Sequence, residues 1–220
     1  MIQANYQYKN YERALKQQKA RYQKRVSEMM RADILRCYTL TFTFSDKTLA
    51  KTTKTTRLRY IKTFLNQQAT DYILNCDYGK LNEREHYHAV ILSRYKIIIF
   101  DAYKNGFIKA RKLHDTIENQ YNERTQPTAE RLTNHAFKET TRNSKIIYSR
   151  ASNKINPRFK RLAYKKLKEY NESEIGKAKK QLFYAQMLGN RQQAIQNKRD
   201  LEKWEKEHEE LERELHIFDA

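Results

Sequence analysis

The sequence predicts an α+β protein in which a central antiparallel sheet is flanked by helices, with further helical extensions at the N- and C-terminal ends. Two observations support this fold class. Several short segments alternate apolar and polar residues, a period of two that is typical of strands with one buried face. The connections between these segments are too short for regular helical crossovers, so neighbouring strands are expected to run antiparallel.

The first half of the chain contains the clearest signals. Residues 4–31 include neither Gly nor Pro, and apolar residues at helical spacing predict a basic helix there. The alternation in 37–44 predicts the first strand. An apolar face around 55–68 predicts a helix. The segments 70–77 and 85–92 predict the second and third strands.

The second half is less regular. Residues 95–100 are apolar and β-branched, and Asn105-Gly106 is a turn signal before Phe107. Pro127 favours the first turn of a helix. The last segment has an imperfect heptad, so a coiled coil is only an alternative there. The predicted elements are helices at 111–124, 127–141 and 158–170, a short strand at 144–149, and a long charged helical segment at 174–216.

The charge is strongly positive. The 220 residues carry 45 Lys and Arg against 26 Asp and Glu, a formal net charge of +19. The excess is spread along the chain, and only the last twenty residues are acidic on balance. Because such an excess repels itself, we expect a polyanionic partner, most simply nucleic acid.

Other classes are excluded by composition. No apolar run approaches the roughly 18 residues that a membrane span needs, and we expect no signal peptide. Cys37 and Cys76 are too few for a disulfide scaffold, which favours a reducing compartment such as the cytoplasm. We predict three regions: a basic N-terminal helix at 1–31, a central domain at 32–156, and a helical region at 157–220.

The sharpest local signal is a pair of histidines in the third predicted strand. His86 and His88 are two residues apart, so both imidazoles should lie on one face of the strand. Two His and one carboxylate leave open positions on a metal ion. Asp77 is the candidate carboxylate if the strands form a hairpin, because Glu83 should fall in the turn and Glu85 should face the other side. Alternatively, the pair simply belongs to a polar outer face.

Three segments resemble the first two motifs of the HUH endonucleases, and more narrowly the rolling-circle replication initiator (Rep) proteins of small phages and plasmids. They are Leu40-Thr41-Phe42-Thr43-Phe44, Asp77-Tyr78-Gly79 and Glu85-His86-Tyr87-His88-Ala89-Val90-Ile91. The resemblance covers roughly residues 36–150. It implies an antiparallel sheet with the His pair on a middle strand. It also implies that Asp77, His86 and His88 bind a divalent metal, Mg or Mn.

Members of that family cut one DNA strand with a helical Tyr, which is followed by Lys. The matching segment here has Lys138, but His135 stands three residues before it, at the position where the family has its Tyr. Tyr148 is our first substitute nucleophile and Tyr121 our second, although Tyr121 also fits an ordinary apolar stripe. His135 acting as a base on water is a further alternative.

The resemblance implies metal-dependent, strand-specific DNA nicking that initiates rolling-circle replication in a bacterial cytoplasm. Its expected partners are single-stranded or origin DNA and host replication proteins, with oligomerisation through the C-terminal helix as an option. The alternatives are a non-catalytic DNA-binding relative, a mobilisation relaxase and a single-Tyr transposase. The predicted DNA-binding residues are Arg57, Arg59, Arg84, Arg150, Lys154, Arg158, Lys160 and Arg161.

Overall fold

The computed structural model describes residues 2–78, 85–114, 116–118, 125–137, 146–149 and 157–219. The chain forms two compact units, Met1–Asn153 and Lys154–Ala220. The first unit holds a five-stranded antiparallel sheet with helices around it, and the second is helical. The predicted α+β fold, with helices at both ends of the chain, is confirmed.

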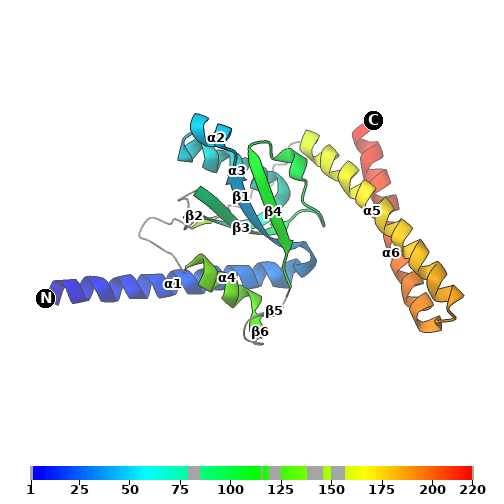
Figure 1. Ribbon diagram of the computed structural model, residues 1–220, viewed down its shortest axis with the longest axis horizontal. Helices are drawn as coiled ribbons and strands as arrows, with labels where there is room; N and C mark the ends of the chain where they lie inside the picture. The colour runs from blue at the N-terminus through cyan, green and yellow to red at the C-terminus, as the bar shows by residue number, and fades with distance from the viewer. Residues whose placement is uncertain are drawn as a thin grey trace. The chain divides into compact units, whose positions relative to one another are not determined.

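The sheet has the strand order β4-β1-β3-β2-β7, and every neighbouring pair is antiparallel. The third strand in chain order, β3, is therefore the middle strand of five (Figure 1). A separate two-stranded ribbon pairs β5 with β6. The strands are β1 Cys37–Phe44, β2 Ala69–Tyr78, β3 Glu85–Ser93, β4 Gly106–Lys112, β5 Thr116–Glu118, β6 Thr125–Pro127 and β7 Ile147–Tyr148.

Two helices beside the sheet begin at residues whose side chains cap them. Ser45 accepts a hydrogen bond from the Thr48 amide at the start of α2, and Thr53 does the same for the Thr56 amide at the start of α3. Among the described residues, no helix is long and apolar enough to cross a membrane. The helices are α1 Ile2–Asp33, α2 Asp46–Lys51, α3 Lys54–Gln68, α4 Thr128–Ala136, α5 Pro157–Met187 and α6 Arg191–Asp219, with short 3-10 turns η1 Ile34–Arg36 and η2 Phe100–Ala102.

One face of the sheet packs against α3 and forms the larger core. Leu40, Phe42 and Phe44, which alternate along β1, are buried on this side and meet the apolar face of α3. Figure 1 shows α2 and α3 together on this side of the sheet. The central members of this core are Leu40, Phe42, Phe44, Ile61, Phe64, Leu65, Tyr87 and Ile91.

The opposite face is partly covered by α1 and α4 (Figure 1). Tyr22, Val26 and Met29 of α1 are buried there against Ile73 and Val90 of the sheet. Phe137, just after α4, meets the Tyr22 ring edge to face, with 5.8 Å between ring centroids. The basic N-terminal helix therefore packs on the sheet through its apolar stripe and belongs to the first unit.

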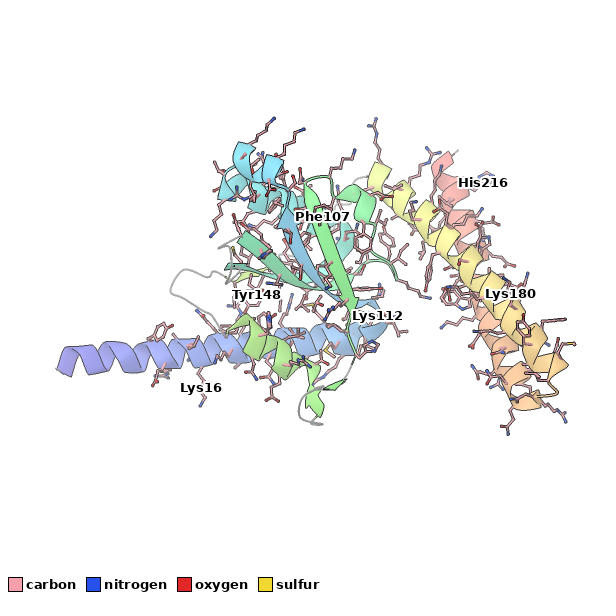
Figure 2. The ribbon with its side chains drawn as sticks, in the orientation of Figure 1. Lys16, Phe107, Lys112, Tyr148, Lys180 and His216 are labelled. Atoms are coloured by element: carbon pink, nitrogen blue, oxygen red, sulfur yellow. The ribbon has the colours of Figure 1, made fainter. Side chains whose placement is uncertain are left out.

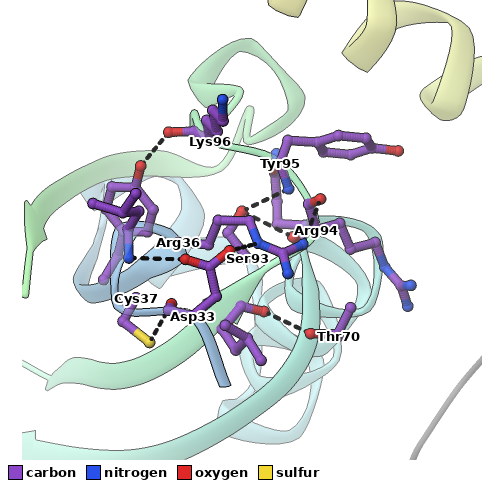
Figure 3. A network of polar contacts seen from close by, with 12 residues as sticks. Asp33, Arg36, Cys37, Thr70, Ser93, Arg94, Tyr95 and Lys96 are labelled. Atoms are coloured by element: carbon purple, nitrogen blue, oxygen red, sulfur yellow. Dashed lines mark hydrogen bonds and ion pairs between the residues drawn. The ribbon is translucent and has the colours of Figure 1, made fainter. Parts of the chain in front are cut away.

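A polar network holds the junction between α1 and the sheet (Figure 3). Arg36 pairs with Asp33, with 2.6 Å between Nε and Oδ2, and it also donates to the Arg94 carbonyl at 3.4 Å. The Cys37 thiol donates to the Asp33 carbonyl at 3.3 Å. Burial, together with the nearby Asp33 charge, raises the pKa of Cys37 to about 11, so this thiol stays protonated at neutral pH.

The predicted helix at 111–124 is wrong. The strand β4 continues to Lys112, and Thr116–Glu118 forms β5, which pairs with β6; residues 119–124 lie outside the described residues. The stripe of Leu113 and Ile117 fits a helix by spacing, yet pairing with β1 imposes the extended backbone on 106–112. Leu113 also donates its backbone N–H to the Cys37 carbonyl at 2.9 Å, extending that pairing.

The predicted single segment at 174–216 is also wrong. The chain turns after Met187 and returns as α6, so that α5 and α6 form a helical hairpin in the second unit. Gly189 occupies the left-handed region, with φ of 66°, which ends a helix at little steric cost for glycine. The acidic end of α6 lies against α5 through the ion pairs Lys168–Glu212 and Lys179–Glu205.

We predict that Gly106→Ala destabilises the first unit by about 1–3 kcal/mol, because a Cβ there would lie 2.1 Å from the Thr43 carbonyl oxygen and force β4 away from β1. Urea denaturation followed by far-UV circular dichroism measures this loss. The matched control is Gly176→Ala in α5, where nothing lies within 4 Å of the added methyl and helix propensity improves. Equal stability of the two variants would contradict the close approach at Gly106.

Candidate functional site

The sheet face that carries His86 and His88, here called the histidine face, is organised in three cross-strand rows. Residues that pair directly across antiparallel strands share one face of a sheet, so each row gathers side chains from several strands. The first row is Phe107, Thr43, His86 and Asp77; the second is Lys109, Thr41, His88 and Asn75; the third is Arg111, Thr39, Val90 and Ile73.

Each histidine of the pair is held by a threonine of β1. The Thr43 hydroxyl lies 3.2 Å from His86 Nδ1, and the Thr41 hydroxyl lies 3.2 Å from His88 Nδ1. A hydrogen bond on Nδ1 fixes the ring and leaves Nε2 as the second functional nitrogen. Both imidazoles are half-buried, which suits groups that are fixed by the protein yet reachable from outside.

A third imidazole approaches the pair from α4. The rings of His88 and His135 are 5.7 Å apart between centroids and nearly perpendicular, at 79°. Arg131 lies one helical turn before His135, on the same side of α4. His135, which stands in the position where the resemblance expects a nucleophile, therefore lies beside His88, one of the two predicted metal ligands.

A cavity of about 500 Å³ lies on this face beside His88 and His135. Four permanently charged side chains line it, from β4 and α4, and no Asp or Glu is among its described lining residues. Figure 2 shows Phe107 near the start of β4 and Lys112 at its end. The concentration of positive charge makes this cavity suited to an anion such as a phosphate group. Its cationic residues are Lys109, Arg111, Lys112 and Arg131.

The predicted carboxylate ligand is placed by backbone register alone. Asp77 of β2 lies directly opposite His86 of β3 in the backbone register, as the predicted hairpin requires. The side chain of Asp77 is not among the side chains that the structure describes. Among the described residues, no group of three His, Cys, Asp or Glu side chains could hold a metal ion. The donors that the structure describes at the predicted centre are therefore the two imidazoles.

Glu85 lies on the other face of β3, as expected, and is buried there. Its carboxylate receives hydrogen bonds from Arg57 of α3, one of them 3.0 Å from Nε. The two side chains are only 9% and 12% exposed. Arg57, a predicted DNA-binding residue, is therefore engaged inside the fold. Arg59 is exposed on the same helix, which covers the face opposite the His pair.

Tyr148, the first candidate nucleophile, lies on the edge strand β7 and pairs with Ile73 of β2. Two strand spacings therefore separate its backbone from β3, about 10 Å. Its half-buried ring lies under Arg21 of α1, with 4.6 Å from the guanidinium carbon to the ring centroid. Burial raises the pKa of Tyr148, although the Arg21 charge acts against this. The strand order therefore places Tyr148 two strands away from the His pair.

Several predicted site residues cannot be placed against the pair. Arg158, Lys160 and Arg161 lie on α5, in the second unit. The remaining ones lie outside the described residues: Tyr121, Lys138, Arg84, Arg150 and Lys154.

The cationic residues of the cavity were missed by the sequence interpretation. Lys109, Arg111 and Lys112 fall near the start of the helix wrongly predicted at 111–124. The alternation after Asn105-Gly106, in which Phe107, Lys109 and Arg111 are separated by Ile108 and Ala110, was the signal that could have located them. Arg131 could have been found from its spacing to His135 on the predicted helix.

No family model matches the chain, and no similar curated protein or solved structure was found. The resemblance to the HUH endonucleases thus remains a prediction based on motifs.

We predict that Glu85→Gln lowers the free energy of unfolding by about 3–5 kcal/mol, because it leaves the buried Arg57 charge without its counterion. Chemical denaturation measures the loss. The control is Glu28→Gln, which removes an exposed carboxylate 4.0 Å from Lys24 and should change stability by less than about 0.5 kcal/mol. If Glu85→Gln were as mild as the control, the pair would have no structural role.

Proposed function

We propose that this chain is a metal-dependent, strand-specific DNA endonuclease that nicks single-stranded DNA, of the kind that initiates rolling-circle replication. The observation that carries the proposal is the pairing of two threonine-anchored imidazoles with a cationic cavity on one sheet face. The proposed setting is a bacterial cytoplasm, with origin DNA and host replication proteins as partners.

The donor set fits a divalent metal. The Thr43 and Thr41 hydroxyls hold Nδ1 of His86 and His88, so Nε2 is the ring nitrogen that would bind the metal, which is the orientation that second hydrogen bonds give to metal-binding histidines. Asp77, opposite His86 in the backbone register, is the proposed third ligand. A bound Mg²⁺ or Mn²⁺ would draw negative charge from a phosphate oxygen.

The cavity supports binding of the DNA backbone. Lys109 and Arg111 of β4 and Arg131 of α4 surround the space beside His88. Phosphate contacts from such residues supply most of the affinity for nucleic acid and make it dependent on salt. A strand held there would pass its phosphates next to the His pair.

His135 is the group best placed to assist the cut. It contacts His88 across the cavity, whereas Tyr148 lies on the edge strand β7 under Arg21. A neutral imidazole near pH 7 can accept a proton from water. Cutting by water leaves a free 5′-phosphate, and cutting by a tyrosine leaves a covalent protein–DNA adduct, so the product identifies the nucleophile.

A non-catalytic DNA-binding protein is the second candidate. The observation that favours it is the position of Tyr148, whose packing and raised pKa make it a poor nucleophile in the described arrangement. This candidate retains the cationic cavity and predicts DNA binding without any cut product.

We predict that His86→Ala and His88→Ala each abolish cutting of randomised single-stranded oligonucleotides in Mn²⁺ while changing DNA affinity less than about threefold, because Lys and Arg make the phosphate contacts. Denaturing gels measure both cut product and covalent adduct. His216→Ala, an exposed histidine of α6, is the matched control and should cut normally.

Saturating DNA binding by the unmodified protein without product would favour the non-catalytic candidate. An adduct that Tyr148→Phe abolishes would show that Tyr148 moves to the site. A cut without adduct that His135→Ala abolishes would support the water mechanism.

We also predict that Thr41→Val and Thr43→Val each weaken Mn²⁺ binding about 10- to 100-fold, since they remove the hydroxyls that orient His88 and His86. Paramagnetic broadening of the imidazole resonances by Mn²⁺ gives the affinity independently of activity. Thr39→Val, in the row without a histidine, is the control. Equal Mn²⁺ affinity in all three variants would contradict the orienting role.

A further inference from the structure

An exposed aromatic ring lies on the histidine face beside the site. Phe107 is 75% exposed, although it sits in the first cross-strand row with Thr43 and His86. A single exposed apolar side chain is common on protein surfaces and needs no explanation by itself. What distinguishes Phe107 is its place on the edge strand β4, two strand spacings from His86, and the residues that follow it.

The next two residues of β4 on the same face are cations. Lys109 and Arg111 follow Phe107 at intervals of two, so the three side chains are spaced roughly 7 Å apart along the strand. Both cations are exposed, and neither forms an ion pair with a carboxylate of the described residues. An aromatic ring followed by exposed cations matches a single nucleic-acid strand, whose bases stack on rings while its phosphates meet Lys and Arg.

We propose that β4 is a binding platform for single-stranded DNA, in which Phe107 stacks on a base while Lys109 and Arg111 hold the adjoining phosphates. The inference rests on the proposed function, and it names the surface that guides the strand to the His pair. His86 lies only about 10 Å from Phe107 across β1. A DNA strand whose base stacks on Phe107 can therefore continue along the first row to the His pair.

The positive charge of β4 favours single-stranded DNA over a second copy of the chain as the partner that binds there. An unpaired edge strand can bind another strand, but Lys and Arg on an edge oppose such pairing by repulsion. Lys109, Arg111 and Lys112 occupy most of the second half of β4. A copy of the same edge would bring these charges together, whereas a polyanion neutralises them.

The test measures binding of fluorescent oligothymidylate by anisotropy, without divalent metal. We expect Phe107→Ala to weaken binding roughly 5- to 150-fold, the range for losing one stacked base, and Phe107→Trp to retain it. Affinity for an abasic strand of equal length should not change with Phe107→Ala. Lys109→Ala should weaken both probes and lower the slope of log affinity against log salt by about 1.

The matched control is Phe183→Ala, which removes another exposed aromatic ring, 57% exposed, from α5. Unchanged oligothymidylate affinity in Phe107→Ala, or an equal loss with the abasic strand, would overturn the platform. Loss of self-association in sedimentation together with loss of binding would assign Phe107 to a protein contact and also overturn it.

If the unmodified protein binds neither probe, the proposed function fails; if it binds normally and Phe107→Ala has no effect, only the platform fails.

Discussion

The antiparallel register between β1 and β3 is the constraint on which the candidate site depends. It pairs Thr43 with His86 and Thr41 with His88. A slip of one residue would turn both histidines toward α3 and expose the residues that now fill the core. The register is fixed on the other face, where Phe44 meets Tyr87 and Phe42 meets Phe64, each edge to face. Burying each such ring contributes about 1.5–3 kcal/mol, so apolar packing positions the polar chemistry.

The histidine face is divided by the helices that cover it. Toward β2, Ile73, Asn75 and Val90 are buried, since α1 and α4 pack over that side. Toward β4, the side chains of Phe107 and Lys109 are exposed. A long ligand can therefore reach the His pair over β4 and β1. The same division keeps Tyr148 at the closed side, where α1 holds its ring.

The parts of the fold and of the candidate site that depend on local sequence patterns were predicted, and the parts that depend on contacts between distant segments were not. The strand β1 and the first half of β3 alternate clearly, and the His pair and its hairpin partner Asp77 were located from their spacing. The strand β4 was missed because its pairing partner β1 lies far away in the chain, and a nearby apolar stripe suggested a helix instead. The contact of His135 with His88, and the hold of Thr41 on that histidine, depend on tertiary packing that no local pattern reveals.

The acidic residues explain why the cavity keeps its charge. Several described carboxylates are paired with specific cations elsewhere in the fold. Asp33, Asp71 and Glu85 pair with Arg36, Arg25 and Arg57, and the acidic end of α6 pairs within the hairpin through Glu205 and Glu212. The exposed pairs among these, such as Lys179–Glu205, contribute little stability, whereas the Arg57–Glu85 pair is buried; both kinds affect where charge remains uncompensated. These paired carboxylates lie outside the cavity. The cations of β4 and α4 around His88 have no carboxylate among the described residues that line the cavity. Part of the net charge of +19 is thus concentrated as a local positive potential on the histidine face, which the proposed binding of a DNA strand requires.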